Sequence, residues 1–216
     1  PDVMMHQLTA LSERDLAANS RIRREGTRYL IDAAAAAGVG RIVAQSIAWA
    51  YEPGNAPATE TDPLDSTGTQ PRGGTVAGVR ALEETVGELP DHVVLRFGQL
   101  YGPGTWYSRD GLFGDLARRG ELPVSAGVSS FVHVADAAHA ALLALDWPAG
   151  VVNIVDDEPA SGREWASAFA AAVGAPAPAV VSERAPWERG AHNALARRLG
   201  WAPSCRTWRD GFSALE

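Results

Sequence analysis

Few side chains in this sequence could carry metal or nucleophilic chemistry. Cys205 is the single cysteine, which excludes a disulfide framework and a thiolate cluster. Residues 156–158, Asp-Asp-Glu, have the composition of a ligand triad, but a solvated turn before a proline explains them better. His133 lies within an apolar strand pattern, where a histidine is usually a core residue with satisfied hydrogen bonds. We therefore expect no metal site, since no His/Asp/Glu group has ligand spacing.

A ligand-binding turn is the strongest chemical signal. Residues 93–105 begin as an apolar, β-branched run and end in a turn built from Gly102, Pro103 and Gly104. In a parallel α/β sheet, the loops at the carboxyl ends of strands are where ligands bind. The pattern indicates an enzyme with a small-molecule substrate. The 216 residues contain no lysine and no Gly-x-Gly-x-x-Gly loop, which argues against the usual dinucleotide mechanism.

The composition argues against nucleic-acid and membrane partners and indicates the cellular compartment. The net charge is −7 and the charges are scattered, so no basic face is expected for nucleic acid or for an anionic membrane surface. No apolar run approaches the roughly 20 residues that a membrane-spanning helix needs. No signal peptide pattern opens the printed sequence, so we expect a cytoplasmic protein.

Strands alternate with helices along the chain, which predicts a parallel α/β sheet. The expected strands are Val3–His6, Arg41–Ser46, Val93–Phe97, Ser130–Val134 and Val151–Val155. The expected helices are Glu13–Ala37 ending at Gly38, Thr75–Leu89, Gly111–Arg119, a helix capped by Asp136 and running through Leu145, Ser161–Val173 with Glu164 in a capping box, and Arg189–Leu199. Residues 52–74 lack an apolar period and are expected to form a long loop.

Four segments, in this order, resemble the extended short-chain dehydrogenase/reductase superfamily, in the branch of NAD(P)-dependent sugar-nucleotide epimerases and dehydratases. They are Gln45-Ser46 after a strand, the Leu95–Gly104 run, the Phe-Val-His-Val-Ala-Asp run at 131–136, and Asn153–Pro159. The resemblance implies a Rossmann-type parallel sheet with a smaller C-terminal substrate lobe. It divides the chain into a partial Rossmann-type core over 1–105 and a substrate lobe over 106–216, interleaved with the last core strands and helices.

The resemblance also implies what would hold a cofactor, which is NAD or NADP. In the family a first strand, its glycine-rich turn and two further strands precede the equivalent of Val3–His6, so the sheet is expected to be N-terminally truncated. Binding of NAD(P) is expected only if that segment exists in the native protein. The positions that match cofactor-binding segments of the family are Leu8, Thr9, Gln45, Phe97, Gly98, Gln99 and Leu100. Gly98 could equally end a strand and permit close backbone approach.

The catalytic positions depart from the family pattern, which is a serine followed by Tyr-x-x-x-Lys on the next helix. Ser46 matches the serine, whereas Val76 stands at the tyrosine and Arg80 at the lysine. Valine cannot transfer a proton, and arginine does not replace lysine as a compact donor. Tyr51 is a candidate substitute, with Arg80 or Arg96 lowering its pKa. The alternatives are that Tyr51 packs on the sheet as a loop aromatic and that the Ser46 hydroxyl caps the strand end.

Two functions remain open at this point. The first is an NAD(P)-dependent epimerase/dehydratase-like or reductase-like enzyme with an atypical site, acting on a small, sugar-like molecule. Trp106 and Tyr107 would stack on its ring, or else only anchor a loop. The alternative is a cofactor-free Rossmann remnant that works as a ligand-binding or regulatory module, or as a non-redox enzyme. Family members often dimerise through two long helices, which implies a homodimer formed by Glu13–Ala37 and Thr75–Leu89.

Overall fold

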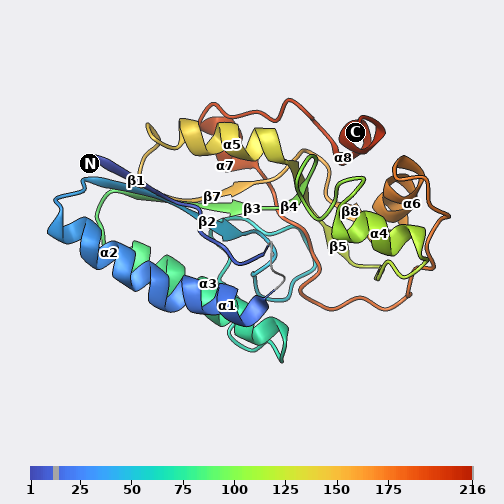
Figure 1. Cartoon of the computed structure of the whole chain (residues 1–216), viewed down its shortest axis with the longest axis horizontal. Coiled ribbons are helices and arrows are strands. Elements are labelled where there is room, and N and C mark those ends of the chain that lie inside the picture. The colour runs from blue at the N-terminus through green and yellow to red at the C-terminus, as the bar shows by residue number, and fades with distance from the viewer. Residues whose placement is uncertain (12–14, 216) are drawn as a thin grey trace.

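A parallel sheet forms the centre of the molecule, as the computed structural model of residues 1–11 and 15–215 describes it. Four strands lie in the order β1-β2-β3-β7 (Figure 1). Their bounds are β1 Val3–His6, β2 Arg41–Ile47, β3 His92–Phe97 and β7 Gly150–Ile154, and every neighbouring pair is parallel. The inner strands β2 and β3 are apolar along most of their length because both of their faces are covered. The α/β class with a Rossmann-type sheet is confirmed.

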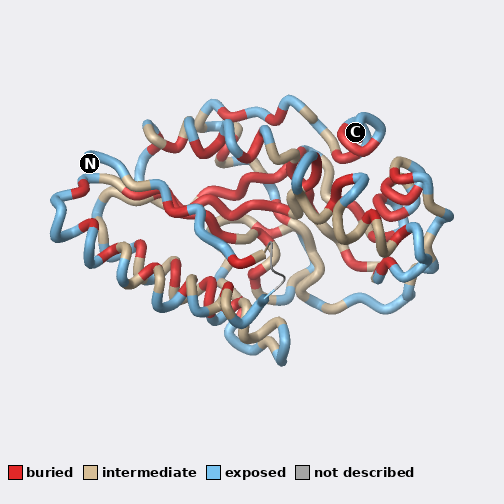
Figure 2. The backbone as a smooth tube through the Cα atoms, in the orientation of Figure 1, coloured by how far each residue is buried: buried red, intermediate tan, exposed pale blue. Residues whose placement is uncertain are grey.

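Helices cover the sheet on both faces (Figure 1). One face carries a nearly continuous helical rod and α3 (Arg72–Val86), and the other carries α5 (Val134–Leu143) and α7 (Ala194–Arg198). The rod consists of α1 (Leu16–Arg21), the π-helical turn η1 (Ile22–Gly26) and α2 (Thr27–Ala36). Figure 2 shows that burial concentrates on the strands and on the helix sides that face them. The apolar faces of the helices therefore supply the core on either side of the sheet.

A smaller lobe adjoins the sheet at its carboxyl edge (Figure 1). Two short strand pairs and three helices build it: β4 (Gln99–Tyr101) with β6 (Phe131–His133), β5 (Val128–Ser129) with β8 (Ala160–Ser161), and α4 (Leu112–Arg118), α6 (Gly162–Ala172) and α8 (Trp208–Ser213). Its core is aromatic, with Phe131 packed edge-on against Tyr107, Trp165 and Phe212. The chain returns to the sheet twice, after β6 through α5 and β7 and after α6 through α7, before it ends in the lobe with α8.

Several helix ends follow from local chemistry. Gly38, with φ of +70°, ends α2, as expected for a residue in the left-handed region. At the start of α6 the Glu164 carboxylate accepts hydrogen bonds from the Ser161 amide and hydroxyl, which confirms the capping box. The predicted helix start at Glu13 lies outside the described residues, and the Asp15 carboxylate caps α1 by accepting from the Ala18 amide.

Three helix predictions are wrong at their starts. Asp136 does not cap α5, which begins two residues earlier with His133 as its N-cap. Only Ala194–Arg198 of the expected helix from Arg189 is helical, because Gly190 has φ of +70° and the segment around it bridges other loops. The helix expected from Thr75 begins at Arg72. Among the described helices, none combines the length and the apolar character that crossing a bilayer requires.

Candidate active site

A cavity of about 450 Å³ lies where the carboxyl ends of β2 and β3 meet the smaller lobe. Ala48 and Trp49 follow β2, and Gly98 and Gln99 connect β3 to β4. The smaller lobe supplies the rest of its lining: Tyr107, Pro123, Val124, Ser125, Gly127, Val128, Ser129, Ser130, Trp165, Val181, Trp187, Glu188 and Gly190. The cavity therefore occupies the edge at which open α/β sheets bind ligands.

Aromatic rings form much of the cavity wall. The ring centroids of Trp49 and Trp187 are 6.2 Å apart with their planes tilted by 45°. Tyr107 and Trp165 meet edge to face at 5.7 Å. The Arg72 guanidinium lies 4.5 Å from the centroid of the Trp187 ring. Such walls suit a flat apolar ligand.

Charge is nearly absent from the cavity. Glu188 is the one charged side chain among the described residues that line it. Its carboxylate accepts 2.7 Å hydrogen bonds from the Ser125 hydroxyl and from the Ala185 amide, so both oxygens already have donors. Burial raises the pKa of Tyr107 well above its usual range. The tyrosine among the described lining residues therefore holds its proton more tightly than a free tyrosine does.

Ser46 lies in a buried polar network beneath the sheet and does not line the cavity. Its side chain is only 1% exposed, and its hydroxyl donates a 2.6 Å hydrogen bond to Oε1 of Glu83 on α3. Arg96, its register partner on β3, donates to both Glu83 oxygens, at 2.9 Å from Nε and 2.6 Å from Nη2. The hydroxyl proton of Ser46 is therefore hydrogen-bonded to the Glu83 carboxylate of the Glu83–Arg96 ion pair.

Tyr51 belongs to the same network. Its hydroxyl donates a 2.6 Å hydrogen bond to Oδ1 of Asn153 on β7, and the Arg96 guanidinium lies 4.7 Å from its ring centroid. Burial raises the pKa of Tyr51 to about 12 and outweighs the lowering caused by Arg96. The lowering by Arg96 matches the expectation, but the net shift of the pKa is upward and leaves Tyr51 protonated near neutral pH. Tyr51 packs against the sheet end instead of facing the cavity.

Arg80 lies apart from this network. Its side chain is 43% exposed on α3 and approaches the Glu84 carboxylate at 3.8 Å. It borders a second, smaller hollow together with the loop around Pro63. The structure thus brings Ser46, Tyr51 and Arg96 together, with Arg80 outside the group. Catalytic roles for Ser46, Tyr51 and Arg80 stay predictions.

The predicted cofactor positions line the carboxyl edge of the sheet. Leu8 and Thr9 are exposed just after β1. Gln45 on β2 is buried, and its Nε2 has no hydrogen-bond partner within the described residues. Gly98 permits a close approach, because a Cβ there would lie 2.7 Å from the Ser130 carbonyl oxygen. Phe97 is buried in the sheet core, and Leu100 packs against that core.

Of the two predicted substrate-binding residues, one lines the cavity and the other does not. Tyr107 lines the cavity, whereas Trp106 packs edge-on against Phe113 at 5.9 Å. Sequence reasoning missed Trp49, Trp165 and Trp187. Trp49 carried a usable signal because it follows the carboxyl end of a strand. Trp187 lies in an irregular segment whose path the sequence does not reveal.

The comparisons with known proteins agree with this geometry. No family model matches the sequence. A 3-diazoavenalumate denitrifying reductase of a Streptomyces species is 42% identical, over an alignment that covers 98% of this chain and 79% of the relative. Among solved structures, the Thermus thermophilus UDP-glucose 4-epimerase in complex with NAD is 25% identical with a TM-score of 0.73, covering 99% of this chain and 78% of that one. The Bordetella bronchiseptica enzyme WbmG in complex with NAD and UDP is 22% identical with a TM-score of 0.77, covering 100% and 74%.

Proposed function

Because the chain belongs to the extended short-chain dehydrogenase/reductase superfamily, we propose that it is an NAD(P)H-dependent reductase that removes nitrogen from a small aromatic diazo compound. The denitrifying reductase at 42% identity supports this reaction class. The observation that carries the proposal is an aromatic cavity at the carboxyl edge of the sheet whose described lining contains no lysine, arginine or histidine.

Loss of nitrogen suits such a cavity better than carbonyl reduction does. Carbonyl chemistry needs an acid that protonates the developing alkoxide, which is the role of tyrosine in the family pattern. At an arenediazonium carbon, a hydride would supply the electron pair of the new C–H bond. The C–N bond would break, and the electron pair of that C–N bond would leave with N₂. No oxyanion develops on the substrate carbon. Val76, at the tyrosine position, is buried against Ala50 and Val79. The proposed reaction does not require a proton donor at this position.

The residues present fit the nicotinamide end of a dinucleotide. A reduced nicotinamide dinucleotide, when bound, supplies the hydride. Gly98 and Gln99 would hold it where the cavity meets the sheet, and the unpartnered Nε2 of Gln45 is a donor suited to an amide oxygen. Leu8 and Thr9 extend the same edge toward β1. Residues 1–216 contain no Gly-x-Gly-x-x-Gly loop for the pyrophosphate, so these positions account for one end of the cofactor only.

The walls of the cavity support an aromatic substrate over a nucleotide sugar. A diphosphate requires cations or several converging amide donors. The described lining has no arginine or lysine, and its one charged side chain is the carboxylate of Glu188. Trp49 and Tyr107 instead present ring surfaces that pack against a flat molecule. Exclusion of water by these rings would protect a reactive diazo group from side reactions.

The test uses the protein expressed from its whole reading frame, with 3-diazoavenalumate as the probe and NADH or NADPH as the reductant. We expect one N₂ released per dinucleotide oxidised, and deuterium from a labelled dinucleotide at the carbon that lost nitrogen. Trp49→Ala should lower kcat/KM about tenfold through lost ring contact. Leu142→Ala, at an exposed position on α5, is the control and should retain wild-type kcat/KM.

Absence of both N₂ release and saturable dinucleotide binding would overturn the proposal. Binding of the probe without oxidation of the dinucleotide would favour the cofactor-free binding module.

A further inference from the structure

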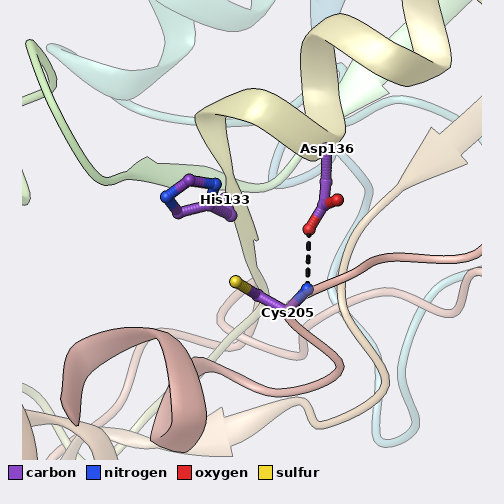
Figure 3. Close-up of side chains that lie close together, drawn as sticks. All are labelled: His133, Asp136 and Cys205. Atoms are coloured by element: carbon purple, nitrogen blue, oxygen red, sulfur yellow. Dashed lines mark hydrogen bonds between the residues drawn. The ribbon is translucent and has the colours of Figure 1, made fainter. Parts of the chain in front are cut away.

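A second cluster of reactive side chains lies away from the cavity lining. His133 ends β6, Asp136 lies in the first turn of α5, and Cys205 lies in the segment before α8. Each offers one ligand atom, and these three atoms lie within 4.8 Å of one another. Figure 3 shows the three side chains facing a common space, with the Cys205 amide bound to Asp136. The sequence separates these residues by up to 72 positions, so only the fold brings them together.

Asp136 is held firmly in this cluster. Its Oδ1 accepts hydrogen bonds from the Ser204 amide at 2.9 Å and from the Ser204 hydroxyl at 2.6 Å. Its Oδ2 accepts one bond, from the Cys205 amide at 3.1 Å. Because a carboxylate oxygen accepts two bonds, Oδ2 keeps one lone pair. Outer hydrogen bonds of this kind orient the ligands of metal sites.

A buried polar group without a partner points into the same place. The Tyr101 side chain is fully buried, and its hydroxyl has no hydrogen-bond partner within the described part of the chain. Its ring lies 5.2 Å from the His133 ring, and its hydroxyl lies near the Cys205 side chain. A thiolate would be a far better acceptor for this hydroxyl than a neutral thiol, and a bound metal ion generates one.

We propose that His133, Asp136 and Cys205 bind one divalent transition metal ion of the zinc class. Imidazole, carboxylate and thiolate together form a donor set that favours Zn²⁺ or Co²⁺ over Mg²⁺ or Ca²⁺. Tetrahedral bonding places ligand atoms roughly 3.5 Å apart, so the cluster must contract by about 1 Å. His133 and Cys205 are both partly exposed, which leaves them room to rotate and leaves a path for the ion.

Binding of the metal ion at this site displaces the thiol proton of Cys205 and changes no oxidation state. The Cys205 S–H bond breaks, the sulfur binds the ion as thiolate, and the proton passes to solvent. The ion would join the start of α5 to the segment that leads into α8, and would thereby stabilise the smaller lobe against the sheet. The site thus has a structural role that is independent of the proposed reductase activity.

The single cysteine makes the test specific. We would titrate tag-free, chelator-treated protein with Co²⁺, and follow the thiolate-to-cobalt charge-transfer band, which Cys205 alone can produce. We expect one equivalent to saturate the band, Zn²⁺ to displace it, and Zn²⁺ to slow the reaction of Cys205 with a disulfide reagent at least tenfold. Zn²⁺ should also raise the Tm.

Two variants and one control complete the design. Cys205→Ser should abolish the band, and His133→Gln should weaken Co²⁺ binding at least tenfold. His139→Gln replaces an exposed histidine on the same helix α5 and should bind as wild type does. Circular dichroism of the metal-free variants checks that they are folded. The proposal fails if equimolar Co²⁺ gives no charge-transfer band in the wild type, or if His139→Gln weakens binding as much as His133→Gln does.

Discussion

At the scale of single residues, the ionisation of Asp156 is strongly coupled to folding. It is buried just after β7, and burial raises its pKa from 3.8 to about 8. Between these two pH values the folded state holds a proton that the unfolded state has lost, so stability falls as pH rises from about 4 to about 8. Asp156→Asn should remove this fall and raise the Tm at pH 8. Thermal unfolding of both proteins across that range would contradict this if their Tm difference did not change with pH.

Glu83 provides a second test at this scale. Its carboxylate pairs with Arg96 in a setting where the two side chains are 10% and 6% exposed. Glu83→Gln leaves the buried guanidinium without its counter-charge, and should cost about 3–5 kcal/mol in the free energy of unfolding. Glu84→Gln, one residue along the same helix, removes a 71% exposed carboxylate and should change it by less than about 0.5 kcal/mol. Equal effects in denaturant titrations would argue against a buried ion pair.

The sequence predicted where residues lie in the fold better than it predicted the direction in which their side chains point. Gly98, Gln99 and Tyr107 were predicted to lie at a ligand site, and all three line the cavity. Ser46 and Tyr51 were placed at the correct end of the sheet, but both turn into the network of Glu83, which no pattern had singled out. Successive side chains of a strand point to opposite faces, and a sequence alone does not say which face bears the ligand.

At the scale of elements, helix α8 contacts the Tyr101 side chain at Gly211, where the absence of a side chain leaves room for the tyrosine ring. A Cβ at Gly211 would overlap the Tyr101 hydroxyl, which lies against the helix at this point. Gly211→Ala should therefore destabilise the protein by about 1–3 kcal/mol, although alanine is the better helix former. Gly26→Ala is the matched control, because its new methyl group would only touch Ile22 at 3.7 Å and should be neutral or stabilising. Chemical denaturation of both variants checks the sign.

The elements that the sequence predicted well are those with a strong apolar pattern. The strands β2, β3 and β7 follow from apolar, β-branched runs, β1 follows from a short apolar run, and α6 follows from the Ser161 capping box. The short strands β4, β5 and β8 could not be predicted, since two or three residues carry no periodicity. The segment from 189 to 193 is not helical because Gly190 has φ of +70° and because bridges tie Ala191 to Ala58 and Arg189 to Val128.

At the scale of the whole molecule, the helical layer of α1, α2 and α3 leaves apolar side chains uncovered. Tyr29 on α2 is 71% exposed, and Leu16 on α1 is 50% exposed. We predict that this layer forms a homodimer, as the family resemblance suggests. Tyr29→Glu should shift the mass measured by light scattering toward the monomer. Leu142→Glu, at a 61% exposed position on α5 across the sheet, should leave it unchanged. A wild type that is monomeric at all concentrations would contradict the prediction.

The ring of Trp187 has a kinetic consequence for the proposed enzyme. It contacts both the Trp49 ring and the Arg72 guanidinium, and Arg72 is itself bound to Asp65 and to the Trp49 and Tyr51 carbonyl oxygens. We predict that a bound molecule leaves past this ring, which then has to separate from the guanidinium. Turnover would then be limited by egress, and added viscogen would slow kcat while leaving a single-turnover rate unchanged.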